Sequence, residues 1–142
     1  MIEQITHLGW ALVTARIIPD ELPEIQATLQ ELANTGIVDL ILTTGGTGCS
    51  PRDVTPEATL GVIEKNVPGI AEMLRLESSK INPHGMLSRG VAGICKSCLI
   101  INLPGSPKAA VENLAIVAPI LPHAVSLIQS NPDAESGHQF NY

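Results

Sequence analysis

The sequence has 142 residues, of which 44% are hydrophobic and 15% charged, a balance typical of one globular domain and not of a disordered chain. Eight lysines and arginines against fourteen acidic residues give a formal charge of −6 without a basic stripe, so no nucleic-acid partner is expected. The first residues lack the basic-then-apolar order of a signal peptide, and Pro119 and Pro122 interrupt the longest uncharged stretch, so no membrane contact is expected.

The first half of the chain alternates predicted helices with predicted strands. In chain order these are a helix over 2–9, a strand over 10–19, a helix over 22–35, a strand over 37–44 and a helix over 56–66. The strand over 37–44 is apolar on both faces, which is typical of a central strand in a sheet covered by helices. Thr55 is expected to cap the helix that follows, with Pro56 in its first turn.

The second half continues the alternation and completes the predicted fold. Its elements are a helix over 68–80, a short extended piece with a turn over 85–94, a strand over 98–104, and helices over 108–116 and 119–129. Ser106 and Pro107 repeat the arrangement of a cap followed by proline. The pattern predicts a three-layer α/β/α domain with a mainly parallel sheet over residues 1–129, followed by a flexible tail over 130–142.

Glycine is concentrated where two of these strands end. Gly45, Gly46 and Gly48 follow the strand over 37–44, and Gly105 follows the strand over 98–104. Ligands of such sheets bind outside the carboxyl ends of the strands, and glycines let the backbone approach a phosphate before a helix N-terminus. Tight strand-to-helix turns also use glycine, so the cluster alone leaves both interpretations open. The spacing matches neither a Walker loop nor a dinucleotide-binding G-x-G-x-x-G.

Two acidic residues are expected at the same edge of the sheet. Asp53 follows the glycine loop, and Asp20 ends the strand over 10–19. Carboxylate oxygens suit Mg²⁺, which is often shared with substrate phosphates, so the pair is typical of metal-assisted phosphoryl or nucleotidyl transfer. The alternative is that Asp53 caps a loop and Asp20 caps a helix.

The three cysteines do not predict a structural disulfide framework. Cys95 and Cys98 form a C-x-x-C pair, but only Cys49 and a nearby His84 remain to complete a metal site. We expect the pair to be two small buried residues that flank a turn, and we prefer this interpretation to a zinc site or a redox pair. An odd cysteine count is typical of a reducing, cytoplasmic compartment.

Several motifs in fixed order resemble one known family. The stretches "LTTGGTG", "RDVTPEAT", "MLSRGVAG" and "LIINLPGSPKA" resemble the molybdopterin adenylyltransferase family, which includes domains of gephyrin and its plant counterpart, over about residues 2–128. The resemblance implies a molybdopterin-binding-like fold and a magnesium-dependent enzyme of molybdenum cofactor biosynthesis that joins the phosphate of molybdopterin to AMP from ATP and releases pyrophosphate. It also implies a homotrimer and a molybdate-insertion protein or fused domain as partner. The alternative is a non-catalytic module of the same fold that serves as a trimerisation or scaffold domain.

The resemblance also assigns site residues by motif position. It implies that Asp20 and Asp53 are the two acids that act in catalysis and bind the metal. The implied binding residues for ATP and molybdopterin are Thr44, Gly45, Gly46, Thr47, Gly48, Ser88, Arg89, Asn102, Pro104, Gly105, Ser106 and Lys108. Arg89 is expected to contact the ligand, whereas Lys108 is more readily explained as a solvated helix residue.

The family begins with a strand and a Ser-Asp loop that the printed sequence does not contain. The resemblance therefore implies a domain that is incomplete at its N-terminus. Because the absent strand is central in the family's sheet, we expect an open edge beside the strands over 10–19 and 37–44. We expect this chain alone to be poorly soluble or inactive in adenylyl transfer.

Overall fold

A computed structural model describes residues 1–130 of the chain, so the tail predicted over 130–142 lies outside the described residues except for Ser130. The helices are α1 (Ile2–His7), α2 (Leu22–Asn34), α3 (Thr55–Leu60), α4 (Pro68–Ile81), α5 (Pro107–Val117) and α6 (Leu121–Ile128), with short 3₁₀ helices η1 (Pro83–Leu87) and η2 (Ala118–Ile120). The strands are β1 (Leu40–Thr44), β2 (Lys65–Asn66), β3 (Ala92–Cys95) and β4 (Cys98–Leu103).

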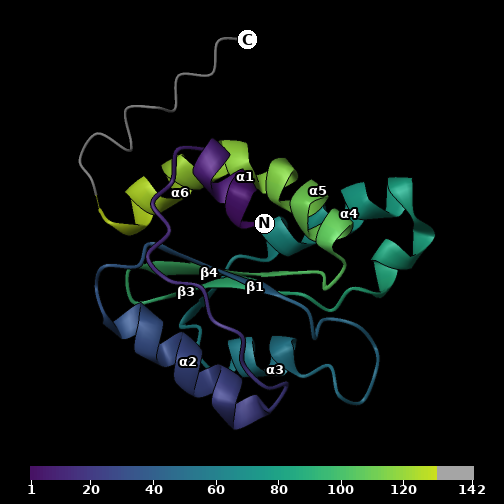
Figure 1. Ribbon diagram of the computed structural model, residues 1–142, viewed down its shortest axis with the longest axis horizontal. Coiled ribbons are helices and arrows are strands. Elements are labelled where there is room, and N and C mark those ends of the chain that lie inside the picture. Colours follow the sequence, from purple (N-terminus) through teal and green to yellow (C-terminus); the bar gives the residue numbers. More distant parts are fainter. Residues whose placement is uncertain (131–142) are drawn as a thin grey trace.

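The elements form three layers, as predicted. Figure 1 shows α1, α4, α5 and α6 on one face of the sheet and α2 and α3 on the other. The strand order is β1-β4-β3-β2, in which β1 and β4 are parallel and the other two pairs are antiparallel. The α/β class is confirmed, but the sheet is mixed and not mainly parallel. Only two residues, Lys96 and Ser97, separate β3 from β4, and a connection this short permits only an antiparallel hairpin.

Strand β4 is the centre of the core. All six of its residues are buried, and its side chains alternate between two apolar clusters. Ile100 packs with Ile25 and Leu29 of α2 in the cluster on one face of the sheet. Leu99 and Ile101 pack in the cluster on the other face, which contains residues of α4, α5 and α6. This alternation is what a strand with a helix on each face requires. Its end at Leu103 is therefore a rigid point from which a site can be built.

Strand β1 was expected to be central, and this prediction is wrong. Among the described strands β1 pairs only with β4, from Leu40↔Leu99 to Thr44↔Leu103, and therefore lies at the edge of the sheet. The prediction of a strand over 10–19 is also wrong, because that segment forms no ladder with any described strand. A strand needs a hydrogen-bonding partner, and Figure 1 shows this segment crossing from the upper helical layer to the lower one.

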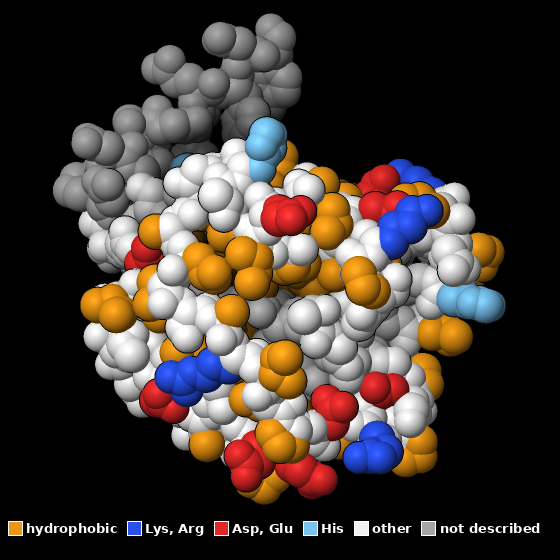
Figure 2. Space-filling view, in the orientation of Figure 1, with side chains coloured by type: hydrophobic (Ala, Val, Ile, Leu, Met, Phe, Trp, Pro, Cys, Tyr) orange, Lys and Arg blue, Asp and Glu red, His pale blue; other side chains and the backbone are white. Residues whose placement is uncertain are grey.

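The segment over 10–19 keeps most of its side chains in solvent. Leu12 and Val13 are exposed by about half, and Ile17 is completely exposed. Figure 2 shows a band of apolar side chains across this face, with charged side chains mostly around it. The apolar side chains that predicted a strand here are therefore mostly not buried in the described fold.

Other local predictions were partly correct. α3 ends at Leu60, and Lys65 and Asn66 pair with β3 as a short strand where the sequence predicted a continuing helix. Thr55 does not cap α3: it is the first helical residue and is buried. Ser106 does cap α5, because its side chain accepts a hydrogen bond from the Ala109 amide at 3.5 Å.

The predicted helix over 68–80 is confirmed as α4. Ile70 and Leu74 are buried, whereas Met73 and Ile81 are exposed.

One stretch, Pro107–Ile128, has the length and mean hydropathy (1.6) of a membrane span. A single such stretch is weak evidence, since core helices have the same composition. It contains α5, η2 and α6, and its residues Leu114, Val117 and Leu121 pack in the same cluster as Leu99 and Ile101 of β4.

Candidate functional site

The two glycine turns at the strand ends pack against each other. Because β1 and β4 are parallel and in register at Thr44↔Leu103, both chains leave the sheet at the same point. The Thr44 hydroxyl donates a hydrogen bond to the Pro104 carbonyl at 2.9 Å, and the Gly45 amide donates to the Leu103 carbonyl at 3.2 Å. A Cβ atom on Gly105 would lie only 3.2 Å from the Gly45 Cα. Glycine at both positions thus allows one backbone to lie on the other.

Gly45 and Gly46 also have backbone conformations that favour glycine, with φ values of +98° and +65°. A Cβ atom on Gly46 would lie 2.3 Å from the Thr55 hydroxyl oxygen, which no side chain tolerates. The Thr55 amide in turn donates to the Gly46 carbonyl at 3.1 Å, so the loop is fixed on the first residue of α3. The tight-turn explanation of the glycines is therefore satisfied, and it does not exclude a phosphate-binding role.

Both predicted acids lie against this loop. One Asp20 carboxylate oxygen lies 3.5 Å from the position that a Cβ on Gly46 would occupy. One Asp53 carboxylate oxygen lies 3.0 Å from the corresponding position on Gly48 and accepts a hydrogen bond from the Ser50 amide at 3.0 Å. No group of three or more potential metal-ligating side chains occurs in the described residues. Two carboxylates beside one loop are nevertheless residues that could hold Mg²⁺, which takes one or two carboxylates and completes its shell with water and substrate oxygens.

A cavity of about 400 Å³ opens beside the two glycine turns. The predicted site residues that line it are Gly46, Thr47, Gly48, Asp53, Ser88, Pro104 and Gly105. The rest of its wall comes from α4, η1 and α5. The structure thus brings half of the predicted binding residues to one cavity from three segments far apart in the sequence.

Arg89, predicted to contact the ligand, instead braces the glycine loop. Its Nε donates to the Gly48 carbonyl at 2.7 Å, its two terminal nitrogens donate to the Asp53 carbonyl and the Glu57 carboxylate, and its backbone amide donates to the Thr47 carbonyl at 2.8 Å. The hydrogen bond from Arg89 also holds the pKa of Glu57 below its ordinary value. Arg89 does not line the cavity, and we assign it a positioning role for the loop that carries Asp53.

Asn102 also acts from beneath the site. Its side chain is 4% exposed, its Nδ2 donates to the hydroxyls of Thr43 and Thr59 at 3.0 and 2.9 Å, and its Oδ1 accepts from the Val91 amide at 3.2 Å. These bonds tie β4 to β1 and α3 directly below the loop. Every buried side-chain polar atom of the described residues has a partner, so this network is complete.

The remaining predicted residues lie near the cavity without lining it. Thr44, Gly45 and Asp20 support the glycine loop, and Ser106 caps α5. The Lys108 side chain is 83% exposed, and its nitrogen lies 3.8 Å from a carboxylate oxygen of Glu112. This fits the interpretation of Lys108 as a solvated helix residue.

Sequence reasoning missed the α4 and α5 side of the cavity. The polar residues that it did not identify are Arg75, Ser78, Asn82, Glu112 and Asn113. The signal available was the spacing of Arg75 and Ser78, which places two polar side chains on one face of α4 beside the buried Leu74, with Asn82 directly after the helix. His84, named above only in connection with a metal site, also lines the cavity.

The C-x-x-C pair behaves as a structural feature. Cys95 and Cys98 are paired across the β3-β4 hairpin and both are buried. Burial raises the pKa of Cys98 to about 12 and also raises the pKa of Cys95, so both thiols are protonated at neutral pH.

A family model described as a probable molybdopterin binding domain matches residues 1–123. The chain belongs to this molybdopterin-binding domain family. Its relatives include gephyrin from Dictyostelium discoideum, 48% identical over 82% of this chain and 16% of that protein. The molybdopterin adenylyltransferase of Helicobacter pylori strain J99 is 46% identical over 81% of this chain and 65% of that protein.

Solved structures of the molybdopterin-binding domain family have the same fold. The molybdopterin biosynthesis enzyme MoaB of Thermus thermophilus superposes with a TM-score of 0.85 at 46% identity, covering 92% of this chain and 82% of that one. The molybdopterin biosynthesis Mog protein of Mycobacterium ulcerans has a TM-score of 0.86 at 36% identity, covering 92% and 84%. The chain spans between 16% and 65% of the length of the curated relatives that it matches.

Proposed function

We propose that this chain carries the adenylyl-transfer site of molybdenum cofactor biosynthesis, in which the phosphate of molybdopterin attacks the α-phosphorus of ATP. A phosphate oxygen forms a bond to the α-phosphorus, the bond from that phosphorus to the oxygen of the β-phosphate breaks, and pyrophosphate leaves. One observation carries the proposal: two interlocked glycine turns border the cavity together with Asp53, and the Asp20 carboxylate lies against the same glycine loop. Relatives named molybdopterin adenylyltransferase support the choice of substrates.

The chain's own residues contribute alignment and charge neutralisation. A phosphate nucleophile is already ionised, so the reaction needs no general base. Gly46, Thr47 and Gly48 line the cavity where phosphate oxygens would lie, and Gly105 of the adjoining turn lines it beside them. Arg89 holds the carbonyls of Thr47 and Gly48, and Asn102 ties β4 to β1 and α3 beneath them, so little reorganisation is needed when charge moves during the reaction.

Asp20 and Asp53 would hold Mg²⁺ at the loop. The ion would supply positive charge beside the phosphate oxygens. The Ser50 amide already orients one oxygen of Asp53, and Arg89 fixes its carbonyl, so this carboxylate is presented in a defined direction.

The test is adenylyl-molybdopterin formation from ATP and molybdopterin by the protein in a soluble, full-length form and by its Asp53→Ala and Asp20→Ala variants. We expect each substitution to lower the rate by about 10²- to 10³-fold, the usual range for loss of one charge-stabilising group. Glu72→Ala, on the exposed surface of α4, is the matched control for loss of one carboxylate. Activity unchanged in both aspartate variants would refute the proposal, and a chain that binds ligand without transfer would instead indicate a scaffold module.

We also propose that the chain forms a homotrimer in the cytoplasm, as the family resemblance implies. Sedimentation equilibrium should give three times the chain mass, and a monomer at micromolar concentration would contradict the assembly.

A further inference from the structure

An anionic substrate needs a cationic partner in the cavity, and the predicted cations do not supply one. All eight lysines and arginines lie within the described residues, so each can be placed. Five of them form ion pairs: Arg16, Lys80, Arg89, Lys96 and Lys108. Lys65 lies on β2 at the far edge of the sheet, and Arg52 is exposed in the loop. None of these seven lines the cavity.

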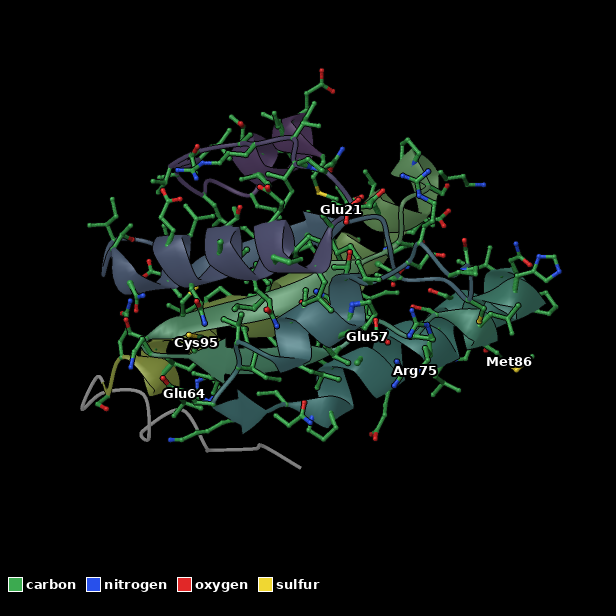
Figure 3. The ribbon with its side chains drawn as sticks, turned by 90° about the horizontal axis from the view of Figure 1, so that it is seen from below. Glu21, Glu57, Glu64, Arg75, Met86 and Cys95 are labelled. Carbon is green, nitrogen blue, oxygen red and sulfur yellow. The ribbon has the colours of Figure 1, made fainter. Side chains whose placement is uncertain are left out.

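Arg75 is the one cationic side chain of residues 1–130 that lines the cavity. It comes from α4, is half-buried, and has no carboxylate of that part of the chain within 4.0 Å. One terminal nitrogen, Nη1, donates to the Gly90 carbonyl at 2.8 Å and lies 3.5 Å from the Ser88 carbonyl. Figure 3 shows Arg75 on the same side of the molecule as Glu57, the partner of Arg89.

The contact with Gly90 anchors one side of the guanidinium and leaves the other available. Nε and Nη2 have no hydrogen-bond partner among residues 1–130. Every buried side-chain nitrogen of these residues does have a partner, so neither Nε nor Nη2 is a buried atom. These two nitrogens therefore remain accessible. A guanidinium presents its N–H groups in a planar fork that matches two phosphate oxygens. Partial burial removes some of the water that would stabilise the positive charge, and no carboxylate compensates for it, so an anion bound to the accessible nitrogens would be stabilising.

We infer that Arg75 is a phosphate-binding residue of this cavity, donating from its free nitrogens to phosphate oxygens of a bound substrate. This inference rests on the proposed function for the identity of the substrates. Both ATP and molybdopterin carry phosphate, and the experiment separates the two sources. Ser88, whose carbonyl Arg75 contacts, lines the same cavity, so the anchored side of the guanidinium is continuous with the predicted site.

The test measures binding by isothermal titration calorimetry for the wild type and for Arg75→Gln, Arg75→Lys and Lys80→Gln. Lys80 is the matched control, because it lies on the same helix but is exposed and paired with Glu77. Each protein is titrated with ATP, with molybdopterin and with adenosine, which lacks phosphate. We expect Arg75→Gln to weaken at least one phosphate-bearing ligand by about 10-fold or more, with Arg75→Lys intermediate and Lys80→Gln unchanged.

The ligand that weakens identifies the phosphate that Arg75 binds. Adenosine affinity should be unchanged in Arg75→Gln, which distinguishes a lost phosphate contact from a distorted cavity. Equal weakening of adenosine, or unchanged affinity for both phosphate ligands, would overturn the inference and leave the proposed function standing. A wild type that binds neither ATP nor molybdopterin would overturn the proposed function together with the inference.

Discussion

Replacing Gly46 by alanine tests the geometry of the glycine loop. The residue has a φ of +65°, a conformation that costs an L-residue about 1–2 kcal/mol. The new Cβ atom would also lie 2.3 Å from the Thr55 hydroxyl oxygen, and relieving such a contact in a packed region costs about 1–3 kcal/mol. We therefore expect Gly46→Ala to lower the free energy of unfolding by about 2–5 kcal/mol, a large part of a total of about 5–15 kcal/mol.

Two other glycines separate backbone strain from steric contact. Gly45 has a φ of +98°, but a Cβ there would lie 3.9 Å from the nearest atom, the Gly105 Cα, so Gly45→Ala should cost only about 1–2 kcal/mol. Gly69 lies in the first turn of α4, and a Cβ atom there would have nothing within 4 Å, so Gly69→Ala should change stability by less than about 1 kcal/mol.

Urea unfolding followed by circular dichroism measures the three variants, and calorimetry with ATP and Mg²⁺ measures binding. The Cβ on Gly46 would also lie 3.5 Å from an Asp20 carboxylate oxygen, so ATP affinity should fall in Gly46→Ala and be lost in Gly46→Val. A Gly46→Ala protein as stable as Gly69→Ala would refute the loop geometry. Unchanged ATP affinity in Gly46→Val would refute the phosphate-loop interpretation.

Three further predictions test the surroundings of the site. Asn102→Ala should lower the free energy of unfolding by about 1–3 kcal/mol, because it leaves the half-buried Val91 amide without its side-chain partner. An unchanged urea midpoint would contradict the network. In the native protein a thiol reagent at neutral pH should label Cys49 alone, since burial keeps the other two thiols protonated. All three thiols should react after denaturation. Rapid labelling of two or more thiols in the native protein would contradict the burial of Cys95 and Cys98. Arg89 lowers the pKa of Glu57 from 4.5, so the contribution of this exposed ion pair to folding stability is present above pH 4.5 and is lost as the pH falls through the lower folded pKa. Glu57→Gln should therefore be less stable than the wild type by under about 1 kcal/mol at neutral pH and equally stable in acid. A difference in urea unfolding that does not change with pH would exclude this linkage.

The sequence predicted the parts of the fold whose signals are local. The helix over 22–35 has buried residues Ile25 and Leu29 at helical spacing, and the run that became β4 is apolar at every position but one. The glycines and the acids beside them were also readable, because tight turns at strand ends require particular residue types. These features depend on the chain's own neighbours, so a single sequence contains them.

The features that the sequence did not predict depend on partners in space. Residues 10–19 have strand-like composition, but no described strand pairs with them, and composition does not report an absent partner. β2 is two residues long and is defined only by its pairing with β3. Arg75 lines the cavity because α4 packs beside η1, and Arg89 turns to the loop carbonyls because they lack other donors. Their roles became visible only when tertiary contacts were known.

The location of the nucleotide is the central claim, and a titration of ¹⁵N-labelled protein with ATP and Mg²⁺ tests it most directly. Amide resonances report binding residue by residue, without requiring turnover. We expect the largest shifts at Gly46, Thr47, Gly48 and Gly105, with smaller ones at Ser88. Shifts confined to other parts of the chain, or no shifts at millimolar ATP, would contradict this claim.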